Sequence, residues 1–277
     1  MIVPGSDTQE LAAALSAALD EPLAAVEYDR FADGERLVQV PETDDRAVVV
    51  ASTVSDSAHV ELLQLQDAAR QQAEEVVTVL PYMGYARQDA AFEDGQPVSA
   101  RAIARAVATG TDRVLTVNPH ETAVCDFFDV PATPVDAAGR LAEPLPSLSD
   151  PLFLSPDAGA IGLAETVSDA YGDGEVDYFE KTRTSDTEVE IEPSDATTTG
   201  RDIVLVDDIV ATGSTMSTAV AQLTAPARVF VTCVHPMLAA NARTKLERAG
   251  VDAVYGTDTI ERPVSAVSVA PAIAEHL

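Results

Sequence analysis

The stretch Ile203-Val-Leu-Val-Asp-Asp-Ile-Val-Ala-Thr-Gly-Ser-Thr-Met216 limits the possible folds of this chain more than any other part of it. Four apolar residues predict a buried strand, which ends at two acids, Asp207 and Asp208. A loop of small residues around Gly213 then leads into an apolar helical pattern that begins at Ser214. A strand, a small-residue loop and a helix in this order predict a phosphate-binding loop in an α/β protein.

The chemistry of this stretch suits a phosphorylated sugar. Residues 211–215 are small, so their backbone N–H groups can surround a phosphate at the positive end of the helix dipole, and their hydroxyl side chains add further donors. The carboxylates of Asp207 and Asp208 can accept hydrogen bonds from sugar hydroxyls. The alternative is that acids ending a strand and a Thr-Gly-Ser-Thr run are ordinary turn chemistry. We favour the phosphate loop because all three parts occur in the required order.

The charge of the chain limits its partners. The sequence holds 46 acidic residues against 17 basic ones, for a formal net charge of −29. Concentrated salt shortens the Debye length to about 3 Å at 1 M and so relieves this self-repulsion, which indicates adaptation to the high-salt cytoplasm of a halophile. The same charge disfavours nucleic acid and anionic membranes as partners. Lysine occurs only at Lys181 and Lys245, and the first of these is two residues from Arg183.

Length and patterning predict two domains. The chain has 277 residues, 46% of them hydrophobic, and short apolar runs alternate with helical patterns from one end to the other. This alternation predicts mainly parallel sheets flanked by helices. A stretch rich in Pro and Ala at 131–146 indicates the connection, so we expect domains at 1–140 and 141–277. The sequence leaves open whether the final helix packs back on the first domain. No apolar run reaches transmembrane length and no secretory signal is present, so we expect a cytoplasmic protein.

Polar residues follow several of the predicted strands, where open α/β sheets bind ligands. The strand at 76–80 leads into Pro81-Tyr-Met-Gly-Tyr-Ala-Arg-Gln-Asp89, whose aromatic residues suit a flat base and whose Arg87 suits phosphate. The alternative for this segment is a solvated loop with surface aromatics. The polar loop at 90–97 has the composition of a lid.

Four further residues follow strands in the same way. His120 comes after the strand at 112–117, and the alternative to a ligand role is an ordinary loop histidine. Asp157 begins a helix and is either its N-cap or an oxygen ligand for Mg²⁺. Lys181 and Arg183 end a strand that continues into a predicted β-ribbon. A phosphate loop, two cations and two candidate metal ligands are typical of phosphoryl-type transfer.

The chain resembles a known family at these residues. The stretch 203–216 is similar to the phosphoribosyl-diphosphate-binding motif that type I phosphoribosyltransferases share with ribose-phosphate diphosphokinases. Phe31-Ala-Asp-Gly-Glu35 resembles the diphosphokinase segment that reaches ATP across a subunit interface, and Pro81–Asp89 resembles the same family's nucleotide site. Ser155-Pro-Asp-Ala-Gly159 and Lys181-Thr-Arg183 match two more of its motifs. With these motifs the resemblance narrows to the shorter, archaeal type of ribose-phosphate diphosphokinase.

The resemblance implies a fold, a reaction and a set of site residues. It implies two tandem phosphoribosyltransferase-like domains, and transfer of diphosphate from MgATP to the 1-hydroxyl of ribose 5-phosphate, with release of AMP. It implies Mg²⁺ as cofactor, a homo-oligomer of at least two subunits and a place in nucleotide biosynthesis. The implied residues are Asp33, Gly34, Glu35, Arg87 and Gln88 for ATP; Arg183, Asp207, Asp208, Ala211, Thr212, Gly213, Ser214 and Thr215 for ribose 5-phosphate; Lys181 and Arg183 for catalysis; and His120 and Asp157 for the metal.

The sequence also departs from the family pattern. Asn118-Pro-His120 stands where the family usually has Asp-Leu-His, and Thr133 stands where a later acid is usual. Ala211 opens the phosphate loop where Asp or Ser is usual, which removes one side-chain contact but leaves the backbone. The alternatives are a phosphoribosyltransferase and a non-catalytic phosphoribosyl-binding regulator, and the two lost carboxylates are the feature that favours the regulator.

Overall fold

The computed structural model describes residues 1–183, 189–193 and 196–277, and the side chains of residues 180–195 lie outside the described part. Its contacts divide the chain into two compact units. The first comprises Met1–Asp136, Asp258–Glu261 and Ser268–Leu277, and the second comprises Ala137–Thr257 and Arg262–Val267. Among the described residues, no helix is both long and apolar enough to span a bilayer.

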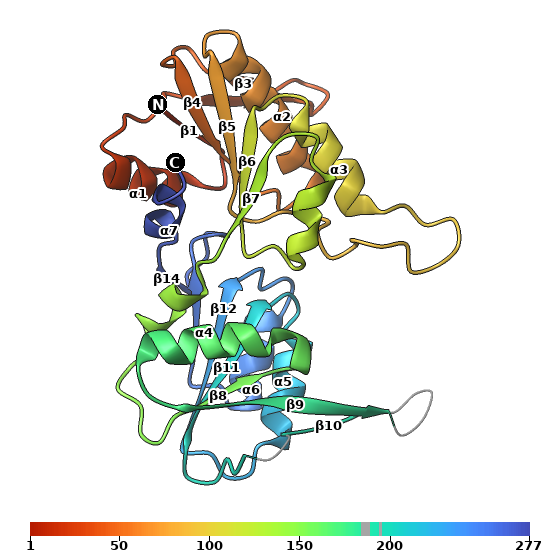
Figure 1. Cartoon of the computed structure of the whole chain (residues 1–277), viewed down its shortest axis with the longest axis vertical. Coiled ribbons are helices and arrows are strands. Elements are labelled where there is room, and N and C mark those ends of the chain that lie inside the picture. Colours follow the sequence, from red (N-terminus) through yellow and green to blue (C-terminus); the bar gives the residue numbers. More distant parts are fainter. Residues whose placement is uncertain (184–188, 194–195) are drawn as a thin grey trace. The chain divides into compact units, whose positions relative to one another are not determined.

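The first unit is built on a five-stranded parallel sheet in the order β1-β4-β5-β6-β7 (Figure 1). A separate antiparallel hairpin, β2 with β3, lies between α1 and β4 in the sequence. The strands are β1 (Ile2–Pro4), β2 (Glu27–Arg30), β3 (Arg36–Gln39), β4 (Arg46–Val50), β5 (Glu75–Leu80), β6 (Arg113–Val117) and β7 (Ala132–Val135). The helices are α1 (Gln9–Leu19), α2 (Asp56–Arg70), α3 (Ser99–Ala108), the 3-10 turn η1 (Thr122–Phe127) and α7 (Ala270–Ala274).

Side chains on both faces of this sheet are buried, as expected for parallel strands. One face packs against α2 and α3, which contribute Leu62, Leu65 and Ala104 to the core. Alternate strand residues such as Val48 and Val79 point to the other face and are equally buried. The helix α1 packs on β1, and α7 packs on α1. The apolar runs in the sequence therefore predict a sheet covered by helices, and the structure confirms this.

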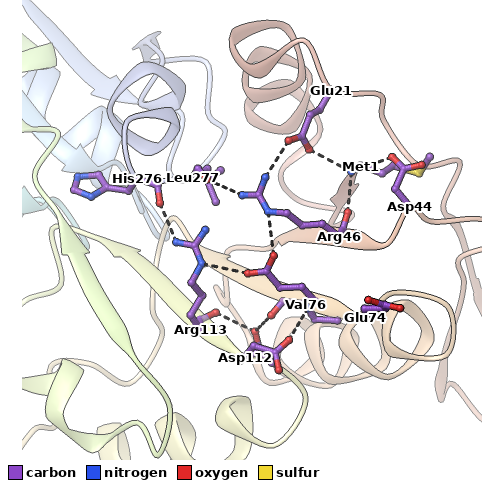
Figure 2. A network of polar contacts seen from close by, with 12 residues as sticks. Met1, Glu21, Asp44, Arg46, Glu74, Val76, Asp112, Arg113, His276 and Leu277 are labelled. Carbon is purple, nitrogen blue, oxygen red and sulfur yellow. Dashed lines mark hydrogen bonds and ion pairs between the residues drawn. The ribbon is translucent and has the colours of Figure 1, made fainter.

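The residues after the second unit return to the first unit (Figure 2). Arg46, which begins β4, pairs with Glu21 at 3.1 Å and donates to the main-chain oxygen of Leu277 at 3.0 Å. Arg113, which begins β6, donates to the main-chain oxygen of His276 at 2.9 Å. These contacts hold residues 276 and 277 at the amino-terminal ends of β4 and β6. The preceding helix, α7, therefore adds its buried side chains to the core of the first unit.

The second unit holds a seven-stranded sheet in the order β10-β9-β8-β11-β12-β13-β14, in which only the β9–β10 pair is antiparallel. In Figure 1, α4 lies in front of this sheet while α5 and α6 lie behind it. The strands are β8 (Leu152–Ser155), β9 (Glu175–Arg183), β10 (Val189–Pro193), β11 (Asp202–Ile209), β12 (Arg228–His235), β13 (Ala253–Thr257) and β14 (Ser265–Val267). The helices are α4 (Ile161–Tyr171), α5 (Ser214–Gln222), α6 (Ala242–Ala249) and the 3-10 turns η2 (Ala138–Ala142) and η3 (Ala158–Ala160).

The strand order places a topological switch point between β8 and β11. From β8 the chain crosses through α4 to β9 on one side, and it later returns to β11 on the other side. Two neighbouring connections that leave a sheet in opposite directions open a crevice at the carboxyl ends of the strands. The phosphate loop, which connects β11 to α5, follows β11, and Asp157 follows β8. Both therefore lie at this switch point. The predicted fold class, tandem α/β domains with mainly parallel sheets, is thereby confirmed.

The stretch at 131–146 contains the division between the two units, after Asp136. It also contains β7, an edge strand that tolerates Pro134 because an edge N–H needs no partner.

Two local patterns of the sequence differ from the structure. The pattern after His235 favours a helix from Met237, but α6 begins at Ala242, because residues 238 and 239 hydrogen-bond to residues 210 and 211. Ser6 has the spacing from Gln9 of a capping box, but it does not cap α1, because its backbone N–H and hydroxyl both donate to the buried carboxylate of Glu61.

Candidate functional site

The acids at the end of β11 lie in the second unit beside a third carboxylate. Asp207 is partly buried, and its pKa is raised to about 8 by burial and by the neighbouring carboxyls of Asp208 and Asp157. Asp157 belongs to the other side of the switch point, so the topology brings these three acids together from two strands. Like charges in a poorly solvated crevice favour protonation of one of them, or binding of a cation or a hydroxyl donor.

The oxygen atoms of this cluster fit Mg²⁺. Mg²⁺ prefers carboxylate oxygens and usually takes one or two of them from the protein, with water and substrate phosphates supplying the rest. Among the described residues no group of three or more side chains forms a ready-made metal cage. The mutual repulsion that raises the pKa of Asp207 is what a divalent cation would relieve.

Asp157 also has a structural role. Its carboxylate accepts a hydrogen bond from the Gly159 N–H at 3.1 Å and caps the 3-10 turn that precedes α4. The N-cap alternative from the sequence is therefore confirmed. A cap uses only part of the accepting capacity of a carboxylate, since its two oxygens offer about four lone-pair positions.

Backbone hydrogen bonds join the loop after Asp208 to the segment that precedes α6. Ala239 donates its N–H to the carbonyl of Ala211 at 2.8 Å, and Leu238 donates in the same way to Val210 at 2.9 Å. Gly213 has a φ of +69°, a left-handed conformation that glycine adopts without strain. Its position leaves little space, because an added Cβ would lie 3.3 Å from a backbone carbonyl and a leucine of α6.

The front of this loop carries donors that are not used within the protein. Within the described part of the chain, the backbone N–H groups of Thr212 to Thr215 have no acceptor. The hydroxyls of Thr212 and Ser214 lie 3.1 Å apart and hydrogen-bond to each other. Four N–H groups at the start of a nine-residue helix, with exposed hydroxyls around them, form the geometry that binds phosphate.

The strand β9 carries Lys181 and Arg183 past the end of its neighbour β8. The last paired residues of these two strands are Ser155 and Tyr178, and β9 continues for five residues beyond them. In this extension Lys181 is opposite Ile191 of β10, which confirms the predicted ribbon (Figure 1). The side chains of Lys181 and Arg183 lie outside the described part of the structure.

In the first unit the segment Pro81–Asp89 follows β5 and is fixed to the start of α2. The Gly84 N–H donates to the Thr53 hydroxyl at 2.8 Å, and a Cβ at Gly84 would lie 2.2 Å from the Thr53 carbonyl, so only glycine fits here. Tyr85 has a φ of +65°, and its hydroxyl donates to Asp56 at 2.5 Å. These contacts fix the backbone just before Arg87 and Gln88.

Arg87 is exposed, whereas the side chain of Gln88 is oriented by α3. The hydroxyl of Ser99, the first residue of that helix, donates to the Gln88 amide oxygen, and the Ala100 N–H donates to the Gln88 carbonyl at 3.1 Å. The Gln88 amide nitrogen has no acceptor among the described residues, so it can donate to a ligand.

Asp33, Gly34 and Glu35 form the exposed tip of the β2–β3 hairpin. Gly34 makes this turn with a φ of +94°, and the Glu35 N–H donates to the Asp33 carboxylate at 3.2 Å. Next to this tip, Arg36 of β3 forms an ion pair with the buried carboxylate of Glu61 on α2. This pair anchors the turn end of the hairpin, so the exposed tip projects from a fixed residue.

His120 lies in the first unit, on the exposed connection between β6 and η1. Two residues earlier, Asn118 donates its side-chain amide to Asp136 at 2.8 Å. An aspartate at position 118 would instead place two carboxylates in contact, so Asn118 here has a structural reason. Thr133 is exposed on the edge strand β7.

Several residues that shape these segments were not predicted from the sequence. Thr53 and Asp56 hold the Pro81–Asp89 segment, and Glu61 holds the hairpin. Ser55 is the sequence signal that could have found Asp56, because serine favours the N-cap of a helix that begins at the next residue, as α2 does. The contact partners could not be read from spacing, because each contact joins segments about 25 to 30 residues apart.

Comparison with known proteins gives full-length matches. Residues 1–110 match the profile of the N-terminal domain of ribose phosphate pyrophosphokinase, and residues 136–270 match that of the phosphoribosyl transferase domain. A ribose-phosphate pyrophosphokinase of Halobacterium salinarum is 64% identical over all of both chains. One of Methanosarcina mazei is 42% identical over all of this chain and 94% of its own.

A solved structure agrees with these matches. The phosphoribosylpyrophosphate synthetase of Mycobacterium smegmatis superposes with a TM-score of 0.82 at 26% identity. The match covers all of this chain and 96% of the other. Fold and sequence therefore point to one family across both units.

The raised pKa of Asp207 predicts how stability depends on pH. Between about pH 4 and pH 8 the folded protein binds a proton on Asp207 that the unfolded chain has released, so stability falls as pH rises through this range. We expect the free energy of unfolding in molar KCl to fall less from pH 5 to pH 8.5 in Asp207→Asn than in the wild type. The difference has an upper bound of about 1.4 kcal/mol per pH unit. Asp169→Asn, an exposed acid of α4, is the control. Equal slopes for all three proteins would contradict the burial of a shared charge.

The Arg36–Glu61 ion pair predicts the rigidity of the hairpin. We expect Glu61→Gln to lower the free energy of unfolding by about 1–3 kcal/mol, because Arg36 then lies against a neutral group. Amide hydrogen exchange at residues 27–39 should become faster in this variant. Asp67→Asn removes a charge from an exposed position of the same helix and should leave that exchange unchanged. Unchanged exchange in Glu61→Gln would show that the hairpin is held by its apolar contacts alone.

Proposed function

This chain belongs to the ribose-phosphate pyrophosphokinase family, and from that premise we propose which of its residues bind each substrate and carry the transfer. As a member of the family it is an enzyme that transfers diphosphate from ATP to ribose 5-phosphate. The products are 5-phosphoribosyl 1-diphosphate and AMP, and the transferred group joins the 1-hydroxyl of the ribose.

The switch point in the second unit is the observation that supports the ribose 5-phosphate site best. Here the unused N–H groups of Thr212 to Thr215 and the acid pair Asp207 and Asp208 lie at the end of one strand. We assign the 5-phosphate to the loop from Ala211 to Thr215 and the 2- and 3-hydroxyls to the acid pair. Ribose 5-phosphate carries a phosphate and two such hydroxyls on one furanose, so the two halves together select a phosphorylated pentose. Ala211 contributes its backbone only.

For ATP we assign three groups of the first unit. Arg87 is exposed and can pair with phosphate, and the Gln88 amide nitrogen can donate to the nucleotide. The hairpin tip, Asp33 to Glu35, supplies carboxylates that can accept from the adenine amino group or from ribose hydroxyls. Because this tip is exposed and resembles a segment that crosses a subunit interface, we propose a homo-oligomer of at least two subunits.

We propose Mg²⁺ as cofactor, and we assign Asp157 in the second unit and His120 in the first unit as metal ligands. Mg²⁺ bound to ATP would neutralise phosphate charge and orient the diphosphate for in-line attack. The chain departs from its family at Asn118 and Thr133, which leaves Asp157 as the carboxylate of this assignment. Asp207 and Asp208 lie beside Asp157. They can accept the proton of the attacking hydroxyl, or hold the ribose by accepting a hydrogen bond from that hydroxyl.

Lys181 and Arg183 are assigned to the transferring group. Attack of the ribose 1-hydroxyl on the β-phosphorus of ATP moves negative charge onto the bridging and equatorial oxygens. Two cations that meet these oxygens stabilise the transition state more than the ground state, and that difference lowers the barrier. The extension of β9 past β8 supports this assignment, because it carries residues 181–183 past the carboxyl end of β8, where the switch point lies.

Production of AMP tests the function. In molar KCl, which suits the net charge of −29, the protein incubated with ATP, Mg²⁺ and ribose 5-phosphate should form AMP and 5-phosphoribosyl 1-diphosphate in equal amounts. A phosphoribosyltransferase would instead need a free base and would form no AMP from ATP. Absence of AMP from protein that circular dichroism shows to be folded would support the regulator alternative and contradict the proposal.

Substitution of Lys181 tests the assignment of the transition-state cation. We expect Lys181→Ala to lower kcat by about a thousandfold, because a charge that acts only in the transition state is lost. The dissociation constant of ribose 5-phosphate should change little. Lys181→Arg keeps the charge and should recover part of the rate. Unchanged turnover of Lys181→Ala at saturating substrates would remove Lys181 from the mechanism.

A further inference from the structure

Lys245 lies beside the phosphate loop although no motif drew attention to it. It belongs to α6, and its ammonium group donates to the hydroxyl of Ser214 at 2.8 Å. Ser214 is the first residue of α5 and one of the residues assigned above to the 5-phosphate. The contact joins positions 31 residues apart, so it follows from the packing of two helices and not from local sequence.

The position of Lys245 is fixed by the same helix face that supports the loop. Ala242 and Leu246 are fully buried, and an added Cβ on Gly213 would lie 3.3 Å from an atom of each. Lys245 is three residues after Ala242, and helix positions three apart share a face, so its side chain can reach Ser214 of the loop. The backbone pair between Ala239 and Ala211 holds the two segments together. The ammonium therefore reaches the loop from a rigid support.

The partners of Lys245 are unusual for this chain. Acids outnumber bases by 46 to 17, and the neighbouring Arg243 pairs with Glu247 at 2.9 Å. Among the described residues, Lys245 instead contacts a hydroxyl and has no carboxylate within ion-pair distance. That hydroxyl is shared with Thr212, and the backbone N–H groups around it have no acceptor. A cation bonded to one of two hydroxyls, next to several N–H groups without an acceptor, is a set of donors that suits an anion.

We propose that Lys245 is a binding and positioning residue for the 5-phosphate of ribose 5-phosphate. Its ammonium orients the Ser214 hydroxyl and supplies the positive charge that the phosphate dianion requires in a strongly acidic protein. Lys245 thereby sets the preference for a phosphorylated over an unphosphorylated pentose. The proposal rests on the function proposed above and adds a residue to the sugar-phosphate half of that site.

Kinetics of three Lys245 variants test this role. We expect Lys245→Ala to raise the KM for ribose 5-phosphate at least tenfold, while kcat and the KM for ATP change less than twofold. Lys245→Arg should stay within about threefold of the wild type because it keeps the charge, whereas Lys245→Gln should resemble Lys245→Ala. Arg243→Ala, on the same helix but paired with Glu247, should leave all constants unchanged. A merely structural role would lower kcat or thermal stability without this split between the two substrates.

Direct binding separates failure of this proposal from failure of the proposed function. Calorimetric titration with ribose 5-phosphate should give a dissociation constant at least tenfold weaker for Lys245→Ala than for the wild type, and titration with ribose should give no such difference. If the wild type forms AMP but its affinity for ribose 5-phosphate equals that of Lys245→Ala, the role of Lys245 is overturned and the function stands. If the wild type forms no AMP, the same titration still decides whether Lys245 binds the phosphate. Should Lys245→Ala prove unfolded by circular dichroism, Lys245→Gln takes its place in both measurements.

Discussion

Repulsion between carboxylates at the carboxyl ends of β8 and β11 is the constraint on which the second unit depends. Asp157, Asp207 and Asp208 approach one another because the strand order puts two strand ends side by side. This arrangement does not stabilise the folded state. The raised pKa of Asp207 reflects the unfavourable burial of that carboxylate and its repulsion by its neighbours. The cost is tolerated because the strands beneath are buried and fully paired, so the sheet holds the acids in place. A cation or a sugar can then bind to groups that are already oriented.

The acids and the phosphate loop carry charge of opposite sign at the same end of the sheet. The acids accumulate negative charge, whereas the start of α5 offers N–H groups and the positive end of a helix dipole. Lys245 adds the one full positive charge that the described residues bring to this loop. A chain with a net charge of −29 has few basic side chains from which to build such a local reversal of sign. Backbone N–H groups remain through every side-chain substitution except proline.

The sequence predicted the architecture well and the supporting contacts poorly. Buried strands in a parallel sheet are nearly continuous apolar runs, so β4, β5, β6 and β11 could be recognised by composition alone. Edge and hairpin strands lack that signal: β7 contains Pro134, and β2 and β3 alternate too briefly to be detected. The start of α6 was misplaced because residues 238 and 239 pair with the phosphate-loop stretch, a tertiary contact that overrides local helix propensity. For the same reason the sequence could name the loop but could not find Lys245 beside it.

The return of residues 268–277 to the first unit has a consequence for synthesis and folding. The sheet of that unit is encoded in the first half of the chain, yet α7 and the partners of Arg46 and Arg113 at residues 276 and 277 come from a segment that follows the second unit in the sequence. The second unit is nearly contiguous, so it can complete its own core while the first unit still exposes the part of α1 that α7 covers. During synthesis the order of completion is therefore the reverse of the order in which the units begin: the unit begun first gains its last helix only after the second unit has been made.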